Sequence, residues 1–194
     1  MRELVFFLEE RSAAAMLEGL LPKLVPDDVV PRYVTFEGKR DLEGQLVKRL
    51  RGYRNPNALF VVMRDQDAQP NCRVIKRKLE RLCNQAGRSG VLIRIACREL
   101  ESFYLADLQA VEQGLGLVGI AAQQGTRKFR DPERLNSAKE ELRKLTKHRY
   151  QPVEGSRAIG PCLDPENGRS RSFRNLVAGI RRLVGAQAEE SKDP

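Results

Sequence analysis

Five carboxylates follow three short apolar segments of the chain, and they are the residues whose type and spacing suit chemistry best. Glu9 follows the first segment, Asp65 and Asp67 follow the second, and Glu99 and Glu101 follow the third. Such a concentration of like charges is unfavourable unless cations neutralise it. Carboxylate oxygens are the ligands that Mg²⁺ and Mn²⁺ prefer. In an extended exit from a strand, residues i and i+2 point the same way, so both Asp65 and Asp67 are expected to reach one metal ion.

Alternating strand and helix patterns would bring these acids together. Residues 4–8, 59–63 and 91–96 are nearly continuous apolar runs, typical of strands buried on both faces of a parallel sheet, and residues 33–36 are a weaker fourth strand. Strands that alternate with helices predict an α/β fold, with a mostly parallel central sheet and helices on both faces. Ligands of such sheets bind beyond the carboxyl ends of the strands, where the acids lie.

Apolar spacing and end signals predict the helices between these strands. Ser12 is expected to cap the first helix, which Pro26 ends, and leucines spaced over residues 42–50 predict the second. Asn71 is expected to cap the third, with Val74 among its inward-facing residues.

The rest of the chain is predicted to be mainly helical. An apolar stripe predicts one helix over residues 100–114, and residues 139–147 predict a short one. Residues 155–169 are rich in turn-forming types, and residues 173–184 predict an amphipathic helix that closes the core.

The charge of the 194-residue chain is strongly positive and uneven. Lys and Arg number 35 against 26 Asp and Glu, a net charge of +9, and residues 127–182 hold 15 basic and 7 acidic side chains. This excess favours polyanions, nucleic acid above all. We expect a core of residues 1–114, a basic C-terminal helical extension of residues 115–185 that packs on it, and a disordered tail of residues 186–194.

Composition argues against several classes of protein. No apolar run approaches the roughly 20 residues that cross a bilayer, and the N-terminal run is too short for a signal peptide, so we expect a cytoplasmic protein without membrane contact. The chain has one histidine, His148, and four cysteines without close pairing. We therefore expect neither a zinc site nor histidine-dependent catalysis, and we interpret the cysteines as reduced packing residues: Cys72, Cys83, Cys97 and Cys162.

The residues around the acids resemble the TOPRIM fold, in which a glutamate follows the first strand and an Asp-x-Asp pair follows a later parallel strand. The resemblance is closer still to a bacterial TOPRIM-like family called domain of unknown function 4276, and it covers nearly the whole chain. It is carried by residues 7–12 (FLEERS), 63–68 (MRDQDA) with Cys72, 94–107 (RIACRELESFYLAD) and 170–174 (SRSFR).

This resemblance implies a TOPRIM-like sheet and the roles of three acids. The TOPRIM glutamate is Glu9 and the Asp-x-Asp pair is Asp65 and Asp67, whereas the glycine that usually follows the glutamate is Glu10 here. Members of the family often occur beside AAA-type or structural-maintenance-like ATPases in settings that suggest phage defence. The resemblance therefore implies an ATPase partner and an antiviral role.

The leading hypothesis is metal-dependent cleavage of phosphodiester bonds in DNA or RNA. Asp65 and Asp67 would bind one Mg²⁺ or Mn²⁺, Glu9 would be a further ligand or the base, and Glu99 and Glu101 would hold a second ion. Seven basic residues of the C-terminal third are the candidates to bind phosphates: Lys128, Arg130, Lys144, Lys147, Arg149, Arg171 and Arg174.

The alternative hypothesis is a non-catalytic TOPRIM-like interaction or regulatory subunit of an ATPase complex. Primase-like activity is disfavoured because the chain is too short for the accessory domains of such enzymes. Topoisomerase action is disfavoured because no tyrosine has a supporting context. The sequence leaves open the choice between DNA and RNA, the partner and the oligomeric state, a homo-oligomer included.

Overall fold

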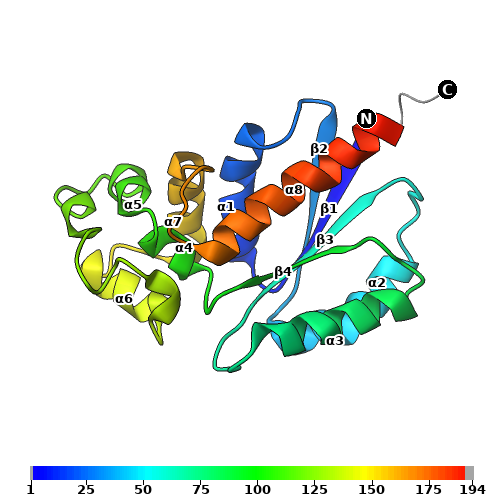
Figure 1. Cartoon of the computed structure of the whole chain (residues 1–194), viewed down its shortest axis with the longest axis horizontal. Coiled ribbons are helices and arrows are strands. Elements are labelled where there is room, and N and C mark those ends of the chain that lie inside the picture. Colours follow the sequence, from blue (N-terminus) through cyan, green and yellow to red (C-terminus); the bar gives the residue numbers. More distant parts are fainter. Residues whose placement is uncertain (1, 191–194) are drawn as a thin grey trace.

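The computed structural model describes residues 2–190 and contains a four-stranded, all-parallel sheet between two layers of helices (Figure 1). The order of the strands across the sheet is β2-β1-β3-β4, so β2 and β4 form its edges. The strands are β1 (Arg2–Leu8), β2 (Val29–Thr35), β3 (Leu59–Asp65) and β4 (Leu92–Ala96). This architecture confirms the expected α/β fold with helices on both faces.

Side chains alternate along the strands and divide the core into two faces. Phe6 and Met63 belong to the cluster under α1 and α8, whereas Phe7 and Val62 belong to the cluster under α2 and α3. These four helices are α1 (Arg11–Leu20), α2 (Lys39–Arg51), α3 (Cys72–Gln85) and α8 (Arg171–Glu190). Residues 4–8 of β1 and 59–63 of β3 are continuous apolar runs because these central strands are buried on both faces.

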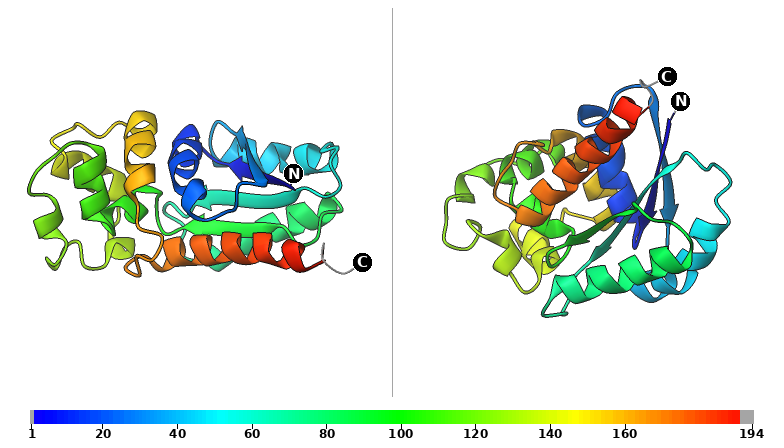
Figure 2. Two further views of the ribbon diagram at one scale, coloured as in Figure 1. Left: turned by 90° about the horizontal axis from the view of Figure 1, so that it is seen from above. Right: turned by 45° about the vertical axis from the view of Figure 1, so that its right-hand side comes forward.

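Four shorter helices gather beyond the carboxyl end of the sheet, opposite the end where the chain starts (Figures 1 and 2). They are α4 (Glu101–Leu105), α5 (Leu108–Gly114), α6 (Ala138–Leu145) and α7 (Pro152–Ile159), with 3-10 turns η2 (Ala121–Gln123), η3 (Pro132–Arg134) and η4 (Gly160–Cys162). A further 3-10 turn, η1 (Leu21–Lys23), directly follows α1. α7 and η4 pack closely on α1, since a Cβ added at Gly160 would lie 2.5 Å from the carbonyl oxygen of Met16.

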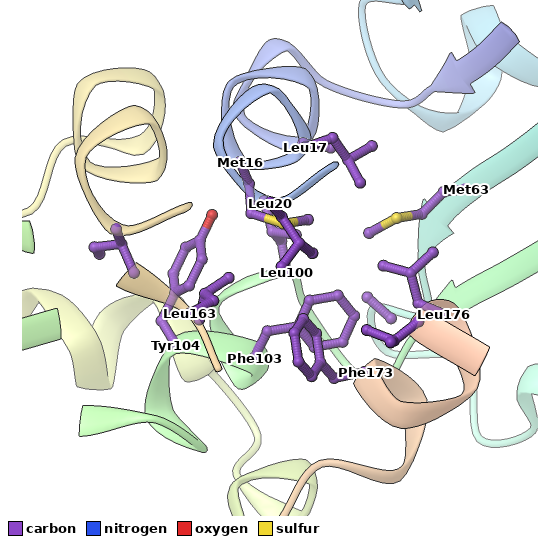
Figure 3. Close-up of a cluster of buried hydrophobic side chains, with 14 of the residues drawn as sticks. Met16, Leu17, Leu20, Met63, Leu100, Phe103, Tyr104, Leu163, Phe173 and Leu176 are labelled. Carbon is purple, nitrogen blue, oxygen red and sulfur yellow. The ribbon is translucent and has the colours of Figure 1, made fainter. Parts of the chain in front are cut away.

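The last helix, α8, runs back beside β4 and closes the core, as its apolar spacing predicts (Figure 2). Phe173 packs against Phe103 of α4 with 5.2 Å between ring centroids, and Leu176 lies in the same cluster as Met63 and Leu100 (Figure 3). Near its other end, the carbonyl oxygen of Val184 accepts a hydrogen bond from Arg2 at 2.8 Å. The helix thereby links the helical group to the start of the sheet.

The first and third helices agree with prediction only in part. The predicted cap at Ser12 is wrong, because α1 begins at Arg11 and the N-cap position is Glu10, whose carboxylate accepts a hydrogen bond from the Ser12 hydroxyl. The predicted cap at Asn71 is confirmed: its side chain accepts a hydrogen bond from the backbone N–H of Arg73 at 2.9 Å. Val74 was expected to face inward but is 52% exposed.

The helical part of the chain also departs from prediction. The single helix predicted over residues 100–114 is two helices, because Asp107 ends the first and caps α5 through the backbone N–H of Ala110. The segment predicted as turns over 155–169 begins inside α7, which Pro152 starts in the favoured first position. α8 is described as far as Glu190, residues 191–194 lie outside the described part of the chain, and the disordered tail predicted over residues 186–194 stays a prediction. The boundary predicted between residues 114 and 115 stays a prediction.

Candidate active site

Glu9 and Asp65 meet at the carboxyl end of the two central strands. Glu9 directly follows β1 and its backbone N–H bonds to the carbonyl oxygen of Met63 at 3.3 Å, which continues the pairing of β1 with β3. Its side chain then turns toward the end of β3, where Oε2 accepts a hydrogen bond from the backbone N–H of Asp65 at 3.1 Å. Parallel pairing of adjacent strands therefore places two carboxylates side by side, as the sequence pattern predicts.

The electrostatics of this pair are those of crowded acids. Burial raises the pKa of Asp65 well above its ordinary value, and the nearby charges of Glu101 and Glu9 raise it further. Burial also raises the pKa of Glu9, although the Asp65 amide and Arg64 partly offset the rise. These acids hold protons more tightly than exposed acids do. A metal cation that replaced the protons would neutralise the same negative charge.

Asp67 does not lie in an extended exit from β3, contrary to the expectation that Asp65 and Asp67 point the same way. β3 ends at Asp65, and Asp67 has a φ of 55°, so the chain turns instead of continuing extended. The carboxylate of Asp67 pairs with Lys39 at 2.7 Å and with Arg64 at 3.4 Å. The expectation that Asp65 and Asp67 point together is therefore wrong in this geometry, and the charge of Asp67 is already paired with two cations.

Arg64 is a buried cation among these acids. Its side chain is only 4% exposed, and it lies 2.7 Å from Glu43 of α2 and 3.6 Å from Glu9. Lys78 of α3 reaches the other oxygen of Glu43 at 2.7 Å. A buried arginine requires such partners, because an unpaired charge in the interior is costly. Arg64 therefore holds the end of β3 against α2.

Glu101 approaches the pair from α4 and is itself buried. Its Oε1 accepts a hydrogen bond from the hydroxyl of Tyr150 at 3.0 Å, and Tyr104 and Tyr150 both contact Ser156 beneath it. Burial raises the pKa of Glu101, while the Tyr150 hydrogen bond lowers it. Glu101 is thus the third member of one acidic centre, which we define as Glu9, Asp65 and Glu101.

Glu99 has a different environment from Glu101. Its Oε2 accepts a hydrogen bond from the backbone N–H of Lys139 at 2.8 Å, at the start of α6. Unpaired N–H groups at a helix start need such acceptors, and a negative charge is favourable there. In this structure one oxygen of Glu99 serves to attach α6, and its proposed part in a second metal site stays a prediction.

A small cavity lies between the end of β3, the end of β1 and the start of α1. Its polar lining residues are Glu9, Glu10, Ser12, Asp65 and the cation Arg64, and the space open to the centre of a water molecule is about 10 Å³. This is about the room that one water molecule needs. The opening lies beside the two crowded carboxylates, so a single small cation or water fits there.

Oxygen ligands of this kind suit Mg²⁺ or Mn²⁺, but the set is incomplete. Across the side chains that the structure describes, those of residues 2–186, no group of three or more acidic, cysteine or histidine residues is arranged to hold a metal ion. Mg²⁺ commonly binds one or two carboxylates and takes its remaining ligands from water and substrate phosphates. Glu9 and Asp65 are two such carboxylates, whereas a metal-binding role of Asp67, which pairs with Lys39 and Arg64, stays a prediction.

The seven basic residues predicted to bind phosphates are exposed and do not form one cluster with the acidic centre. Arg171 lines a groove beside β4, and Lys128 pairs with Glu141 in the helical group. The other five are solvent-exposed side chains on or near η3, α6 and α8: Arg130, Lys144, Lys147, Arg149 and Arg174. Their contact with nucleic acid stays a prediction.

Sequence reasoning missed two residues of the site, Arg64 and Tyr150. Arg64 interrupts an otherwise apolar strand, and a charge in a strand buried on both faces signals a paired interior group. Tyr150 gives no such signal, because it reaches Glu101 from 49 positions away.

Among the described residues, no helix is both long and apolar enough to cross a membrane.

Comparisons with known proteins place this geometry in context. A family model described as "Domain of unknown function (DUF4276)" matches residues 8–181. A solved structure, the C-terminal region of the Burkholderia pseudomallei OLD protein, is similar with a TM-score of 0.52 and 18% identity, and the match covers 93% of this chain and 98% of the other. No curated protein sequence matches the chain. The structural likeness supports the fold, which is TOPRIM-like as expected.

Proposed function

Since the chain belongs to the family Domain of unknown function (DUF4276), whose fold here is TOPRIM-like, we propose that it is a Mg²⁺- or Mn²⁺-dependent nuclease that hydrolyses phosphodiester bonds of DNA or RNA. We further propose that it acts in the cytoplasm as the effector of an ATPase-associated anti-phage system, as the family resemblance implies. The observation that carries the nuclease proposal is the meeting of Glu9 and Asp65, both with raised pKa, at the end of the parallel sheet.

The proposed roles follow from the contacts of each acid. Asp65 and Glu9 would hold the cation, and Asp67 would complete the set once Lys39 turns to a phosphate and the longer pair with Arg64 is given up. When bound, the cation would supply positive charge to the phosphoryl oxygens and lower the pKa of water beside it. In the alternative role, Glu9 would be the base instead of a ligand, since its raised pKa suits a group that takes a proton from the attacking water. The negative charge of Glu101 would act on the site by raising the pKa of Asp65.

The experiment that tests this function measures Mn²⁺ and Mg²⁺ binding by calorimetry, together with cleavage of plasmid, single-stranded DNA and RNA. We expect Asp65→Asn to weaken metal binding at least about tenfold, as loss of a ligand should do at least as much as loss of an outer-shell partner. The matched control is Asp27→Asn, which removes an exposed carboxylate near the start of β2, at the other end of the sheet. Equal binding by wild type and Asp65→Asn would overturn the metal site.

A second candidate function, a non-catalytic subunit of an ATPase complex, is favoured by one observation. Asp67 is paired with Lys39 and Arg64, so the acids are partly neutralised by the chain itself without a metal ion. In that case the Asp65→Asn variant would retain function in cells, and neither wild type nor variant would bind Mn²⁺. Metal-dependent cleavage that is lost in Asp65→Asn would exclude this candidate.

A further inference from the structure

A groove runs along the open edge of the sheet, between α3 and α8, with β4 as its floor. Its volume is about 540 Å³, and Ile93 and Ile95 of β4 lie among its lining residues. The groove exists because β4 is an edge strand, while α3 and α8 cover opposite faces of the sheet and extend on either side of it (Figure 2). We call it the β4 groove.

The β4 groove is lined by five cations and one acid. The cations are Arg73 and Lys76 from α3, Arg94 from β4, and Arg171 and Arg182 from α8. The acid is Glu133, whose Oε1 accepts hydrogen bonds from the Ser172 backbone N–H and hydroxyl, both at 2.7 Å, and from the Ser170 hydroxyl at 2.8 Å. Glu133 keeps its negative charge while it caps α8, so five cations against one acid leave the lining with a formal charge of 5 − 1 = +4.

Most of these cations have no ion-pair partner among the described side chains. Among residues 2–186, whose side chains the structure describes, Arg73, Arg171 and Arg182 form no ion pair, and Lys76 has only a distant one with Glu80 at 3.8 Å. Burial and the neighbouring charge of Arg182 lower the pKa of Arg94, so like charges here face each other. Such uncompensated positive charge attracts a polyanion.

One of the five cations is held rigidly in place. Arg94 donates from Nε to the carbonyl oxygen of Asn175 and from Nη1 to that of Ile93, both at 2.8 Å. Its guanidinium lies against Gly179, where an added Cβ would be 2.2 Å from Nη2. Nη2 donates no hydrogen bond to the described residues, so it is oriented and available for a phosphate oxygen.

The contacts of the edge strand argue against an extended peptide as the occupant. A peptide that adds to a sheet edge needs free backbone groups. Here the carbonyl oxygen of Ile93 is bonded by Arg94, and the backbone N–H of Cys97 donates to the Ser172 hydroxyl at 3.2 Å. Because none of the groove's lining residues is aromatic, recognition would rest on phosphates and not on base stacking.

The groove ends next to the candidate active site. Cys97 lines it, and the next residue, Arg98, accepts a hydrogen bond at its carbonyl oxygen from the backbone N–H of Asp67 at 2.8 Å. We propose that the β4 groove binds the sugar–phosphate backbone of a single-stranded nucleic acid and leads it toward the acidic centre. The direction rests on the proposed function, whereas binding itself requires no catalysis. The volume is that of a small-ligand pocket, which suits a few nucleotides of one strand and not a duplex.

The test is binding of a fluorescent oligonucleotide of about 12 nucleotides, a length typical of single-strand sites, in the presence of a metal chelator. Anisotropy would be measured between about 50 and 200 mM salt, for thymidine and uridine strands and for a duplex of equal length. The main variant is Arg73→Gln with Arg182→Gln, two exposed and unpaired cations from opposite walls. The control is Arg77→Gln with Arg81→Gln, which removes the same charge from α3 outside the groove.

We expect the groove variant to bind single strands roughly tenfold more weakly. We also expect its plot of log K against log salt to be less steep by about 1.4, since each of the two lost phosphate contacts contributes about 0.7 to the steepness. The control should remain within about twofold of wild type. Equal losses in both variants, no binding by wild type at about 50 mM salt, or tighter binding of the duplex would each overturn the proposal. Because no divalent cation is present, these outcomes are independent of the metal-binding test of the proposed function.

Discussion

The side chain of Glu9 accepts a hydrogen bond from the backbone N–H of Asp65, with 3.1 Å between Oε2 and N, although 56 positions separate the two residues. This bond fixes one carboxylate beside another, and Glu101 approaches Asp65 from α4. The repulsion among these acids contributes to the raised pKa of Asp65. Strained electrostatics of this kind are characteristic of functional sites.

We expect Asp65→Asn to stabilise the fold at neutral and higher pH. The pKa of Asp65 is raised in the folded state, so the folded chain binds more protons than the unfolded chain between the two pKa values. Wild-type stability therefore falls as the pH rises through that window. Asparagine resembles the protonated acid and does not ionise, so we expect a gain of about 0.5–2 kcal/mol, measured by urea unfolding at several pH values. Wild type more stable than Asp65→Asn at high pH would contradict this.

Arg64→Met should be strongly destabilising. It leaves Glu9 and Glu43 without their buried cation, and loss of one partner of a buried pair costs roughly 3–5 kcal/mol. The control is Arg11→Met, which breaks an exposed pair with Glu37 worth less than about 1 kcal/mol. Both are measured by urea unfolding, and similar losses in the two variants would show that Arg64 is not a structural cation.

Two glycines should respond to alanine in opposite directions. Gly160→Ala places a Cβ against the Met16 carbonyl oxygen and should separate η4 from α1, with a loss of roughly 1–3 kcal/mol. Gly44→Ala, in the middle of α2 with open space around it, should stabilise by roughly 0.5–1 kcal/mol because glycine is unfavourable inside a helix. Thermal unfolding compares them directly, and a melting temperature raised by Gly160→Ala would contradict the close packing.

The part of the site that the sequence predicts is the part determined by neighbouring residues. Each buried strand appears as an apolar run, and the acid at its carboxyl end is adjacent in sequence, so the meeting of Glu9 and Asp65 follows once the strands are parallel neighbours. The α/β layers follow for the same reason. The orientation of Asp67 does not follow, since a left-handed turn after the strand depends on its bond to Arg98 from another loop.

Contacts between distant segments account for the remaining differences. The partners of Arg64 come from α2, and the β4 groove requires the sheet order together with the path of α8. Charge counting along the chain located a basic region, but Arg73, Lys76 and Arg94 come from outside it. Local sequence patterns do not predict which cations share a surface, because the order of the strands and the path of α8 bring these segments together and leave no periodic signal in the sequence.

Tyr150→Phe tests the support beneath the acidic centre. The Tyr150 hydroxyl donates to the buried carboxylate of Glu101 at 3.0 Å and thereby lowers its pKa. Without this donor the pKa of Glu101 rises further, so the variant loses stability relative to wild type as the pH increases through the pKa of Glu101. At alkaline pH we expect a loss of about 1.5–3 kcal/mol, the range for hydrogen bonds to charged groups.

Tyr33→Phe is the control, since that hydroxyl makes no hydrogen bond within the described residues. Its free energy of unfolding, measured with urea across the pH range, should stay close to that of wild type. A pH-independent loss in Tyr150→Phe would show that the hydroxyl serves packing alone, and Mn²⁺ titration of the same variant would show whether Glu101 acts on the metal site through Asp65.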